Sequence, residues 1–370
     1  MSDQDDTHDG TEDGGMVRDQ WREAWEHRKV EDETRKAQRL LELKTEQAEI
    51  YLKVKTLNEE LAELEGRGDW TGMVSPLSKL GWLGRTPPAR RVLLERDGEC
   101  VLPLGKVGFF VGEGGIGKSW ALTQLAISVA TGTPWFQNFS VPAGSKGAVF
   151  MAMGEEDPEE MHRRLYDVSR HLDLAEHHLS DMEQLLWPLP LAGHFVEFLS
   201  DGDRSFQHER FEQQLRQHAP PDGWKLIVLD PASRFMGIDA EKDNAFATRF
   251  VQLLEQLTEL PGKPTVLCAH HTTKAARASQ SSGSRSVAAR GASALTDGAR
   301  WQGNLAQVFE DGEVVPNMAV FNVTKSNYGP RPPQLYLRRK PGSGVLIPSD
   351  PPGASAAAGG NMFGSKDFSF

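Results

Sequence analysis

A glycine-rich run at positions 112–119, Gly-Glu-Gly-Gly-Ile-Gly-Lys-Ser, constrains the fold of this chain more than any other segment. It follows the apolar run 107–111 and opens a segment of helical pattern that begins at Ser119. In a strand, loop and helix of this kind, backbone N–H groups turn inward and bind phosphate oxygens. We therefore predict a site for ATP and Mg²⁺ formed by Gly112, Gly114, Gly115, Ile116, Gly117, Lys118, Ser119 and Trp120.

Within this loop, two side chains have distinct expected roles. The Lys118 ammonium is expected to neutralise charge on the β- and γ-phosphates, and the Ser119 hydroxyl to bind Mg²⁺. A chance glycine-rich turn is the alternative, but all fixed positions of the motif are present in the correct context.

Short apolar segments alternate with helical patterns from about residue 92 to residue 348. The apolar segments are 107–111, 148–153, 226–229, 265–269 and 320–323, and the helical ones are 119–130, 158–173, 206–218 and 245–260. Buried strands that alternate with helices indicate an α/β fold with a mostly parallel central sheet flanked by helices.

Acidic side chains follow two of the apolar segments. Asp230 comes directly after Leu226–Leu229 and is expected to organise Mg²⁺, although a turn-capping role beside Pro231 is the alternative. Glu155, Glu156 and Asp157 follow the segment 148–153. Of these, Glu156 is the first choice to activate water and Asp157 the second, with Asp157 also a candidate metal ligand. The alternative is that Glu155 to Asp157 serve only the N-terminus of a helix beginning at Pro158, where negative charge is favourable.

The apolar segment 265–269 leads into His270 and His271. His271 is expected to sense the γ-phosphate, because polar groups at the carboxyl ends of parallel strands border the nucleotide crevice. A metal site is the alternative, but the sequence offers no third ligand at a suitable spacing. The polar segment that follows is either a solvated loop or a contact for a nucleic-acid backbone through Lys274, Arg277, Arg285 and Arg290.

Two further cations lie near the end of the predicted core. Arg300 is a candidate to stabilise transition-state charge at the γ-phosphate of a neighbouring subunit, which requires assembly. Lys325 is a second candidate, and also a candidate contact for DNA. The alternative for both is a surface ion pair.

The segment before the core is acidic and helical in pattern. Residues 1–16 are polar and expected to be disordered, and residues 17–66 form a long amphipathic helix with Leu43, Ile50 and Leu57 at heptad spacing. That stripe supports either a coiled coil or one helix packed on the core. Residues 67–91 are expected to be a linker, 92–348 the ATPase domain and 349–370 a disordered low-complexity tail.

Charge and composition indicate which partners and which cellular compartment to expect. Residues 1–70 hold 20 of the 52 acidic and 11 of the 41 basic residues, so the remaining chain is nearly neutral and compatible with DNA. The two cysteines support neither a disulfide framework nor a zinc site. Because no apolar run is long enough to span a bilayer and no signal peptide is evident, we expect a cytoplasmic protein without a membrane partner.

Six motifs occur in one order: GEGGIGKS, GEEDP, IVLDPASRF, CAHHTTK, ARGASALTDGARW and VTKSNYG. Over residues 92–348 this order resembles the RepA-type AAA ATPases, the RecA-fold hexameric replicative helicases of plasmids. The resemblance implies a ring with ATP between subunits, in which Lys118 and Ser119 contact phosphates and magnesium, Glu156 activates water and Asp230 binds magnesium. It further implies His271 as γ-phosphate sensor and Arg300 as arginine finger in trans.

The leading hypothesis is therefore an ATP-dependent helicase or translocase on single-stranded DNA, from a plasmid, phage or other mobile element. The acidic N-terminal helix departs from the compact plasmid helicase and is a candidate site for a primase, initiator or loader. One alternative is a nucleotide-gated DNA-binding or scaffolding ATPase that does not unwind DNA. A weaker one is a protein-directed switch without a DNA partner.

Overall fold

The computed structural model describes residues 13–64, 74–200, 203–237, 244–271 and 293–353 of the 370-residue chain. By its internal contacts the chain divides into two units, Met1–Pro87 and Pro88–Phe370. The predicted disordered N-terminus and low-complexity tail lie largely outside the described residues.

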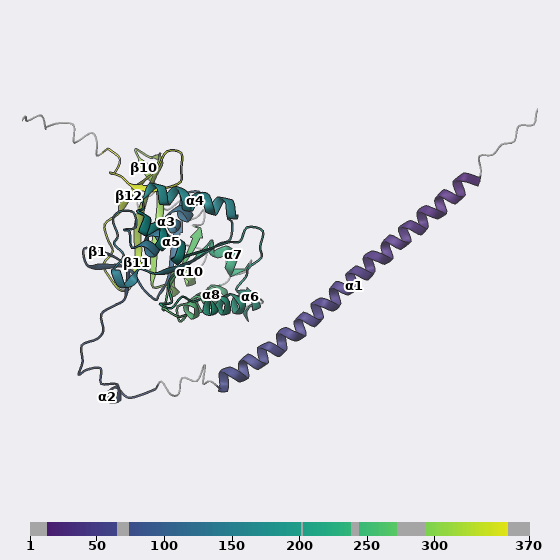
Figure 1. Cartoon of the computed structure of the whole chain (residues 1–370), viewed down its shortest axis with the longest axis horizontal. Helices are drawn as coiled ribbons and strands as arrows, with labels where there is room; N and C mark the ends of the chain where they lie inside the picture. The colour runs from purple at the N-terminus through teal and green to yellow at the C-terminus, as the bar shows by residue number, and fades with distance from the viewer. Residues whose placement is uncertain (1–12, 65–73, 201–202, 238–243, 272–292, 354–370) are drawn as a thin grey trace, which may run out of the picture. The chain divides into compact units, whose positions relative to one another are not determined.

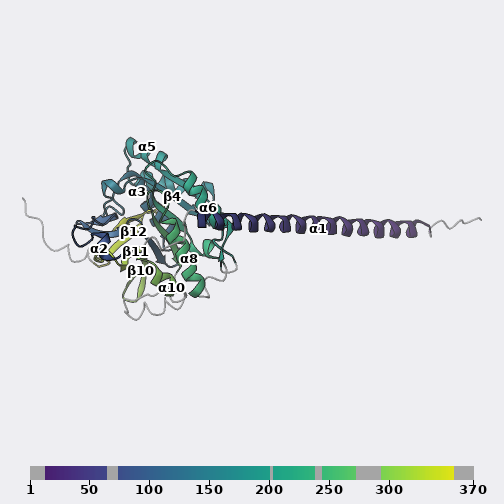
Figure 2. The ribbon, with the colours of Figure 1, turned by 90° about the horizontal axis from the view of Figure 1, so that it is seen from below.

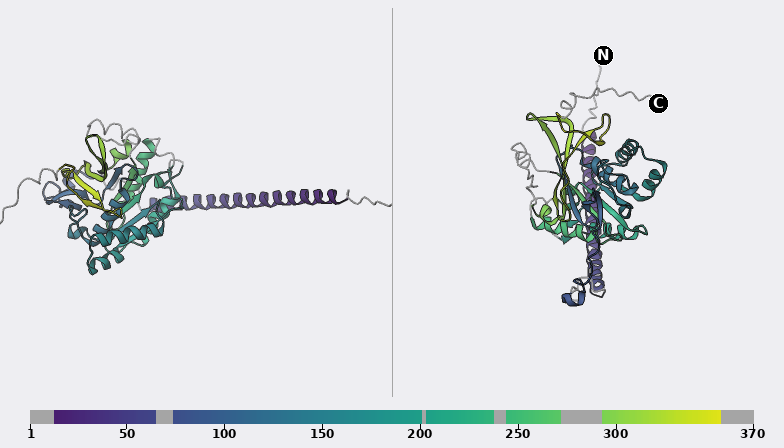
Figure 3. Two further views of the ribbon diagram at one scale, coloured as in Figure 1. Left: turned by 90° about the horizontal axis from the view of Figure 1, so that it is seen from above. Right: turned by 90° about the vertical axis from the view of Figure 1, so that its left-hand side faces the viewer.

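The first unit consists of a long helix, α1 (Asp13–Leu64), and the single turn α2 (Leu77–Leu80). α1 is one unbroken helix, as Figures 1 and 3 show, in agreement with the absence of Pro and Gly from its interior. The side chains of Leu43, Ile50 and Leu57 are exposed, and pairing of this stripe as a coiled coil stays a prediction. No described helix has the length and apolar character needed to cross a membrane.

The second unit is built on a sheet that has nine strands within the described residues, in the order β13-β12-β11-β10-β3-β9-β8-β4-β5. Six neighbouring strands are parallel. They are β10 (Trp301–Glu310), β3 (Val107–Gly112), β9 (Thr265–His271), β8 (Trp224–Asp230), β4 (Ala148–Met153) and β5 (Leu186–Pro190). The antiparallel strands β11 (Glu313–Ser326), β12 (Leu335–Arg339) and β13 (Leu346–Pro348) extend one side.

Helices cover both faces of this sheet, which can be followed in Figure 2. One face packs against α3 (Lys118–Thr131), α4 (Pro158–His171) and α5 (Glu176–Leu185). The other packs against α6 (Phe206–Gln217), α7 (Ala232–Met236), α8 (Asn244–Leu257) and α10 (Ser293–Gly298). Successive residues of β3 and β8 enter opposite layers, so both strands are continuous apolar runs, as expected for a parallel sheet buried on two sides.

Smaller elements complete the unit. β1 (Val92–Arg96) and β2 (Glu99–Pro103) form an antiparallel pair that packs on the α3 side. β6 (Leu199–Ser200) pairs with β7 (Asp203–Arg204), and a short 3-10 turn spans Ala143–Ser145.

The predicted α/β fold with a mostly parallel sheet is confirmed, and each predicted strand and helix of the core is present. The sequence patterns did not reveal β10, because its first half contains the buried polar residues Gln302 and Asn304. Its Gly303 is required by packing, since a Cβ there would lie 2.4 Å from the Trp301 ring.

Candidate functional site

The glycine loop lies between β3 and α3, at the carboxyl edge of the parallel strands. Gly115 (φ +74°) and Gly117 (φ +110°) adopt backbone conformations that L-residues with side chains rarely take. A Cβ at Gly114 or Gly115 would meet no atom within 4 Å, so the mouth of the loop is open. The loop therefore has the backbone shape and the free space of a phosphate cradle at the start of α3.

Lys118 is buried, and its ammonium points into the loop. Nζ donates to the Gly112 carbonyl at 3.0 Å and the Glu113 carbonyl at 2.8 Å, and lies 3.0 Å from His271 Nδ1. Burial lowers the pKa of Lys118 to about 8, against the opposing effect of Asp230. A phosphate anion would restore the stability of the charged form.

Asp230 ends β8 and is buried next to this lysine. Burial raises the pKa of its carboxyl, while a hydrogen bond with Ser119 and the charge of Lys118 lower it. Among the described residues, its Oδ2 has no hydrogen-bond partner. An orphaned buried carboxylate oxygen beside a hydroxyl fits Mg²⁺, which takes few protein ligands and completes its shell with phosphate oxygens and water. No group of three or more His, Cys, Asp or Glu side chains suited to a metal occurs in the described ranges.

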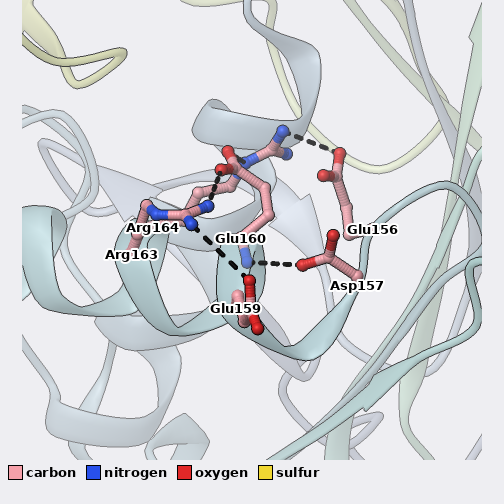
Figure 4. Close-up of polar contacts among 6 residues, drawn as sticks. All are labelled: Glu156, Asp157, Glu159, Glu160, Arg163 and Arg164. Atoms are coloured by element: carbon pink, nitrogen blue, oxygen red, sulfur yellow. Dashed lines mark hydrogen bonds and ion pairs between the residues drawn. The ribbon is translucent and has the colours of Figure 1, made fainter.

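Glu156 and Asp157 differ sharply in environment, as Figure 4 shows. Glu156 Oε1 lies 2.7 Å from Arg164 Nη2, and burial raises the pKa of its carboxyl despite this arginine. Asp157 Oδ1 instead accepts a hydrogen bond of 2.8 Å from the Glu160 backbone N–H and so caps α4. The helix-start alternative therefore describes the position of Asp157, whereas the pKa of Glu156 is also raised by the charge of Asp230.

Arg164 holds this acidic cluster together. Its Nε lies 2.9 Å from Glu160 Oε1, and its guanidinium lies 5.4 Å from the centre of the Trp120 ring. Trp120 also packs tightly against Gly344, where a Cβ would lie 2.0 Å from the ring. Trp120 thus fills space between α3, α4 and the segment before β13, and contact with a nucleotide stays a prediction for it.

His271 ends β9 and pairs in register with Gly112 of β3, which brings it beside Lys118. The preceding His270 is buried, and burial, with smaller contributions from His271 and Lys118, lowers its pKa to about 4. The four cations predicted after His271, at positions 274, 277, 285 and 290, lie outside the described residues.

Arg300 and Lys325 lie at the opposite, amino-terminal edge of the sheet. Arg300 N donates to the Val107 carbonyl, at the start of β3, whereas the glycine loop follows the other end of that strand. Lys325 Nζ donates to the Asp297 carbonyl at 3.0 Å, and burial together with Arg300 lowers its pKa. The structure therefore separates both cations from Lys118 of the same chain, and an effect of Arg300 on a γ-phosphate requires a second subunit.

Sequence reasoning missed two cations of this site. Arg339, from β12, donates to the Gly115 carbonyl of the loop at 2.9 Å, across 224 residues of sequence. Arg164 lies in the helix that follows the GEEDP motif, and the sequence gives no sign that it would pair with Glu156. Neither position carries a local signal, because both contacts depend on tertiary packing.

A buried parallel strand leads into a glycine cradle and a helix, and a lysine, a hydroxyl and a carboxylate lie at the mouth of the cradle. These features define a P-loop ATPase site. The AAA domain family, AAA_25, matches residues 73–277, which is more than half of the chain. The chain belongs to this family.

Several solved structures resemble the chain at low identity. One of them, an ATPase domain, matches at 11% identity and a TM-score of 0.43, covering 66% of this chain and 85% of that one. The RadB recombinase matches at 14% identity and a TM-score of 0.41, covering 64% of this chain and 88% of that one. A DnaB-like replicative helicase, solved for its interactions with primase, matches at 10% identity and a TM-score of 0.42, covering 66% of this chain and 57% of that one.

The buried His270 is expected to make the protein sensitive to mild acid. Its pKa of about 4 lies below the unfolded value of 6.5, so the unfolded chain binds the extra proton between these values and stability is lost as the pH falls through this range. The full difference corresponds to roughly 3 kcal/mol. Denaturant unfolding of wild type and His270→Gln between these pH values checks this, since the variant lacks this part of the slope. Equal slopes would contradict the assignment.

Proposed function

We propose that this protein is an ATP-dependent DNA helicase or translocase of the RepA-like replicative type. In this proposal ATP is hydrolysed at the subunit interfaces of a hexameric ring that moves on single-stranded DNA. The observation that carries the proposal is the convergence of Lys118, Asp230, Glu156 and His271 at the mouth of the glycine loop. The ordered motifs over residues 92–348 support the RepA-like assignment.

The nucleotide would lie with its phosphates on the loop N–H groups. Lys118 would then exchange its contacts with the Gly112 and Glu113 carbonyls for phosphate oxygens. Ser119 and Asp230 would hold Mg²⁺, which shields phosphate charge and orients the γ-phosphoryl group when bound.

Glu156 is the proposed general base. Its carboxyl is partly buried and fixed by Arg164 at 2.7 Å, so it has a defined position from which to orient water and accept a proton. Asp157 is the second candidate, and as the N-cap of α4 it has a competing structural role.

His271 would connect the nucleotide to the strand-binding segment. It contacts Lys118 at 3.0 Å and directly precedes residues 272–292, which contain the proposed DNA contacts Lys274, Arg277, Arg285 and Arg290. A γ-phosphate that draws Lys118 away from His271 would let the His271 side chain move, directly before the first residue of this segment. Cationic segments of this composition suit a single strand.

The proposals of a ring and of partner proteins depend on Arg300 and on helix α1. Arg300, at the edge of the sheet opposite the loop, would act as an arginine finger on the nucleotide of the neighbouring subunit. The exposed apolar residues of α1 would engage a primase, initiator or loader, or a second copy of the helix.

We expect ATP hydrolysis to rise several-fold with single-stranded DNA, and a forked duplex to be separated. Arg300→Ala should abolish turnover while nucleotide binding persists, because a residue acting in trans leaves the loop of its own chain intact. Steady-state ATPase assays with and without oligonucleotide, strand-displacement assays and the mass of the assembly measure these effects.

The outcomes separate the candidate functions. Stimulation by DNA without strand separation supports the nucleotide-gated scaffold, which the exposed stripe of α1 favours. Absence of any DNA response even at low salt, where phosphate contacts are strongest, would contradict a DNA partner altogether. Retained turnover in Arg300→Ala would remove the arginine-finger assignment.

A further inference from the structure

A cavity of about 430 Å³ lies at the amino-terminal edge of the sheet, away from the glycine loop. Its walls come from the segment before β1, from β2, from the turn between β2 and β3, from the turn that follows α8, and from Tyr328 after β11. This volume is within the range of small-molecule sites. All of its lining residues belong to the second unit of the chain.

The cavity is strongly basic in a protein of net charge −11. Four cations, Arg90, Arg91, Lys106 and Lys263, line it together with one acid, Glu259, which pairs with Lys263 at 3.5 Å. Such a local excess of positive charge attracts an anionic ligand.

Two of these cations lie over the same aromatic ring. The Arg90 guanidinium is 5.1 Å, and the Lys106 ammonium 5.8 Å, from the centre of the Tyr328 ring. A ring and a guanidinium plane offer stacking surfaces for a base, and the cations offer partners for phosphate. This combination is the chemistry that recognises a nucleotide.

The cavity cannot serve the nucleotide of its own chain. Lys106 precedes β3 and the glycine loop follows its other end, so six strand residues, or about 20 Å, separate them. The cavity does adjoin the proposed arginine finger: Arg300 N donates to Val107 O, and Asn327 N donates to Arg300 O. The two residues that hydrogen-bond to the Arg300 backbone therefore each adjoin a residue of the cavity: Val107 follows Lys106, and Asn327 precedes Tyr328.

We propose that this cavity receives the nucleotide held by the glycine loop of a second copy of the chain. Arg90 and Lys106 would contact its phosphates, and Tyr328 its base. The proposal rests on the proposed ATPase function, to which it adds a second half of the site. Because the loop and the cavity lie at opposite edges of one sheet, each subunit would present one half to each neighbour, a head-to-tail contact that closes into a ring.

Complementation between two defective chains tests the proposal. Lys118→Ala has a damaged loop and an intact cavity, whereas Arg90→Ala/Lys106→Ala has the reverse. The double variant is expected to lose at least about tenfold in unstimulated ATPase rate. When equal amounts are mixed before assembly, about a quarter of head-to-tail interfaces pair two intact halves, so the rate should recover to about a quarter of wild type.

The controls isolate charge and folding. Arg210→Ala/Arg249→Ala removes two cations from exposed positions on α6 and α8 and should keep the wild-type rate. Unfolding midpoints and assembly masses establish that each variant is folded and assembled, and Arg90→Gln/Lys106→Gln repeats the test with smaller changes in volume.

Three results would overturn the proposal. They are an unchanged ATPase rate in the double variants, no recovery when the two folded variants are mixed before assembly and form joint assemblies, and loss of DNA binding alone with the unstimulated rate intact. The last result would identify the cavity as a nucleic-acid contact. Failure of the ATPase function itself is distinguished by wild type, which would then show no hydrolysis in any of these assays.

Discussion

Replacing Lys118 by alanine is expected to reduce ATP hydrolysis at least about 100-fold, because it removes a preorganised cation from the developing phosphate charge. The ammonium is already held at the loop by two carbonyls, at 3.0 Å from Gly112 and 2.8 Å from Glu113. Truncation leaves those carbonyls facing the phosphates without a cation, so nucleotide affinity should fall as well. Steady-state hydrolysis and titration with a non-hydrolysable ATP analogue measure both effects.

The matched control for this variant is Lys79→Ala, which removes an exposed lysine from α2. Its hydrolysis rate and nucleotide affinity should equal those of wild type. If Lys118→Ala keeps more than about a tenth of the wild-type rate while folded, the loop is not the catalytic phosphate site.

Replacing Glu156 by glutamine should reduce hydrolysis about 100- to 10,000-fold and leave nucleotide binding nearly unchanged. Glutamine keeps the shape of the side chain and an oxygen for Arg164, which lies 2.7 Å away, but it cannot accept the proton of water. The loss should therefore fall on the chemical step, which single-turnover hydrolysis measures separately from binding.

Two neighbouring substitutions make this assignment specific. Glu159→Gln changes an exposed acid that lies 3.8 Å from Arg163, and it should be neutral. Asp157→Asn preserves a helix-capping side chain, so the structure of α4 should persist. A large loss in Asp157→Asn with an active Glu156→Gln would transfer the role of general base to Asp157.

The carboxyl edge of the sheet could be predicted from the sequence because its signals are local. An apolar run that ends in a polar residue identifies both a buried strand and the group at its end, as at Asp230 and His271. In a parallel sheet those ends meet, which brings His271 to 3.0 Å from Lys118 although 153 residues separate them in sequence.

The remaining features depend on strand order and side-chain packing, for which one sequence carries no pattern. β10 is buried with Gln302 and Asn304 in it, so no apolar run marks the strand. The parallel pairing of β10 with β3 places Arg300 at the amino end of β3, at the opposite edge of the sheet from the glycine loop. Because the sequence does not reveal β10, it does not reveal this position of Arg300. The contacts of Arg164 with Glu156 and of Arg339 with Gly115 likewise arise only after the helices and the antiparallel strands have packed.

We expect the loop at residues 112–119 to enclose a nucleoside triphosphate, with magnesium at Ser119 and Asp230. The direct test is titration of the purified protein with a fluorescent, non-hydrolysable ATP analogue, with and without Mg²⁺. One nucleotide per chain should bind saturably, more weakly when Mg²⁺ is removed, and binding should be lost or strongly reduced in Lys118→Ala. Absence of binding by folded wild-type protein in the presence of Mg²⁺, or equal binding by wild type and Lys118→Ala, would contradict this expectation.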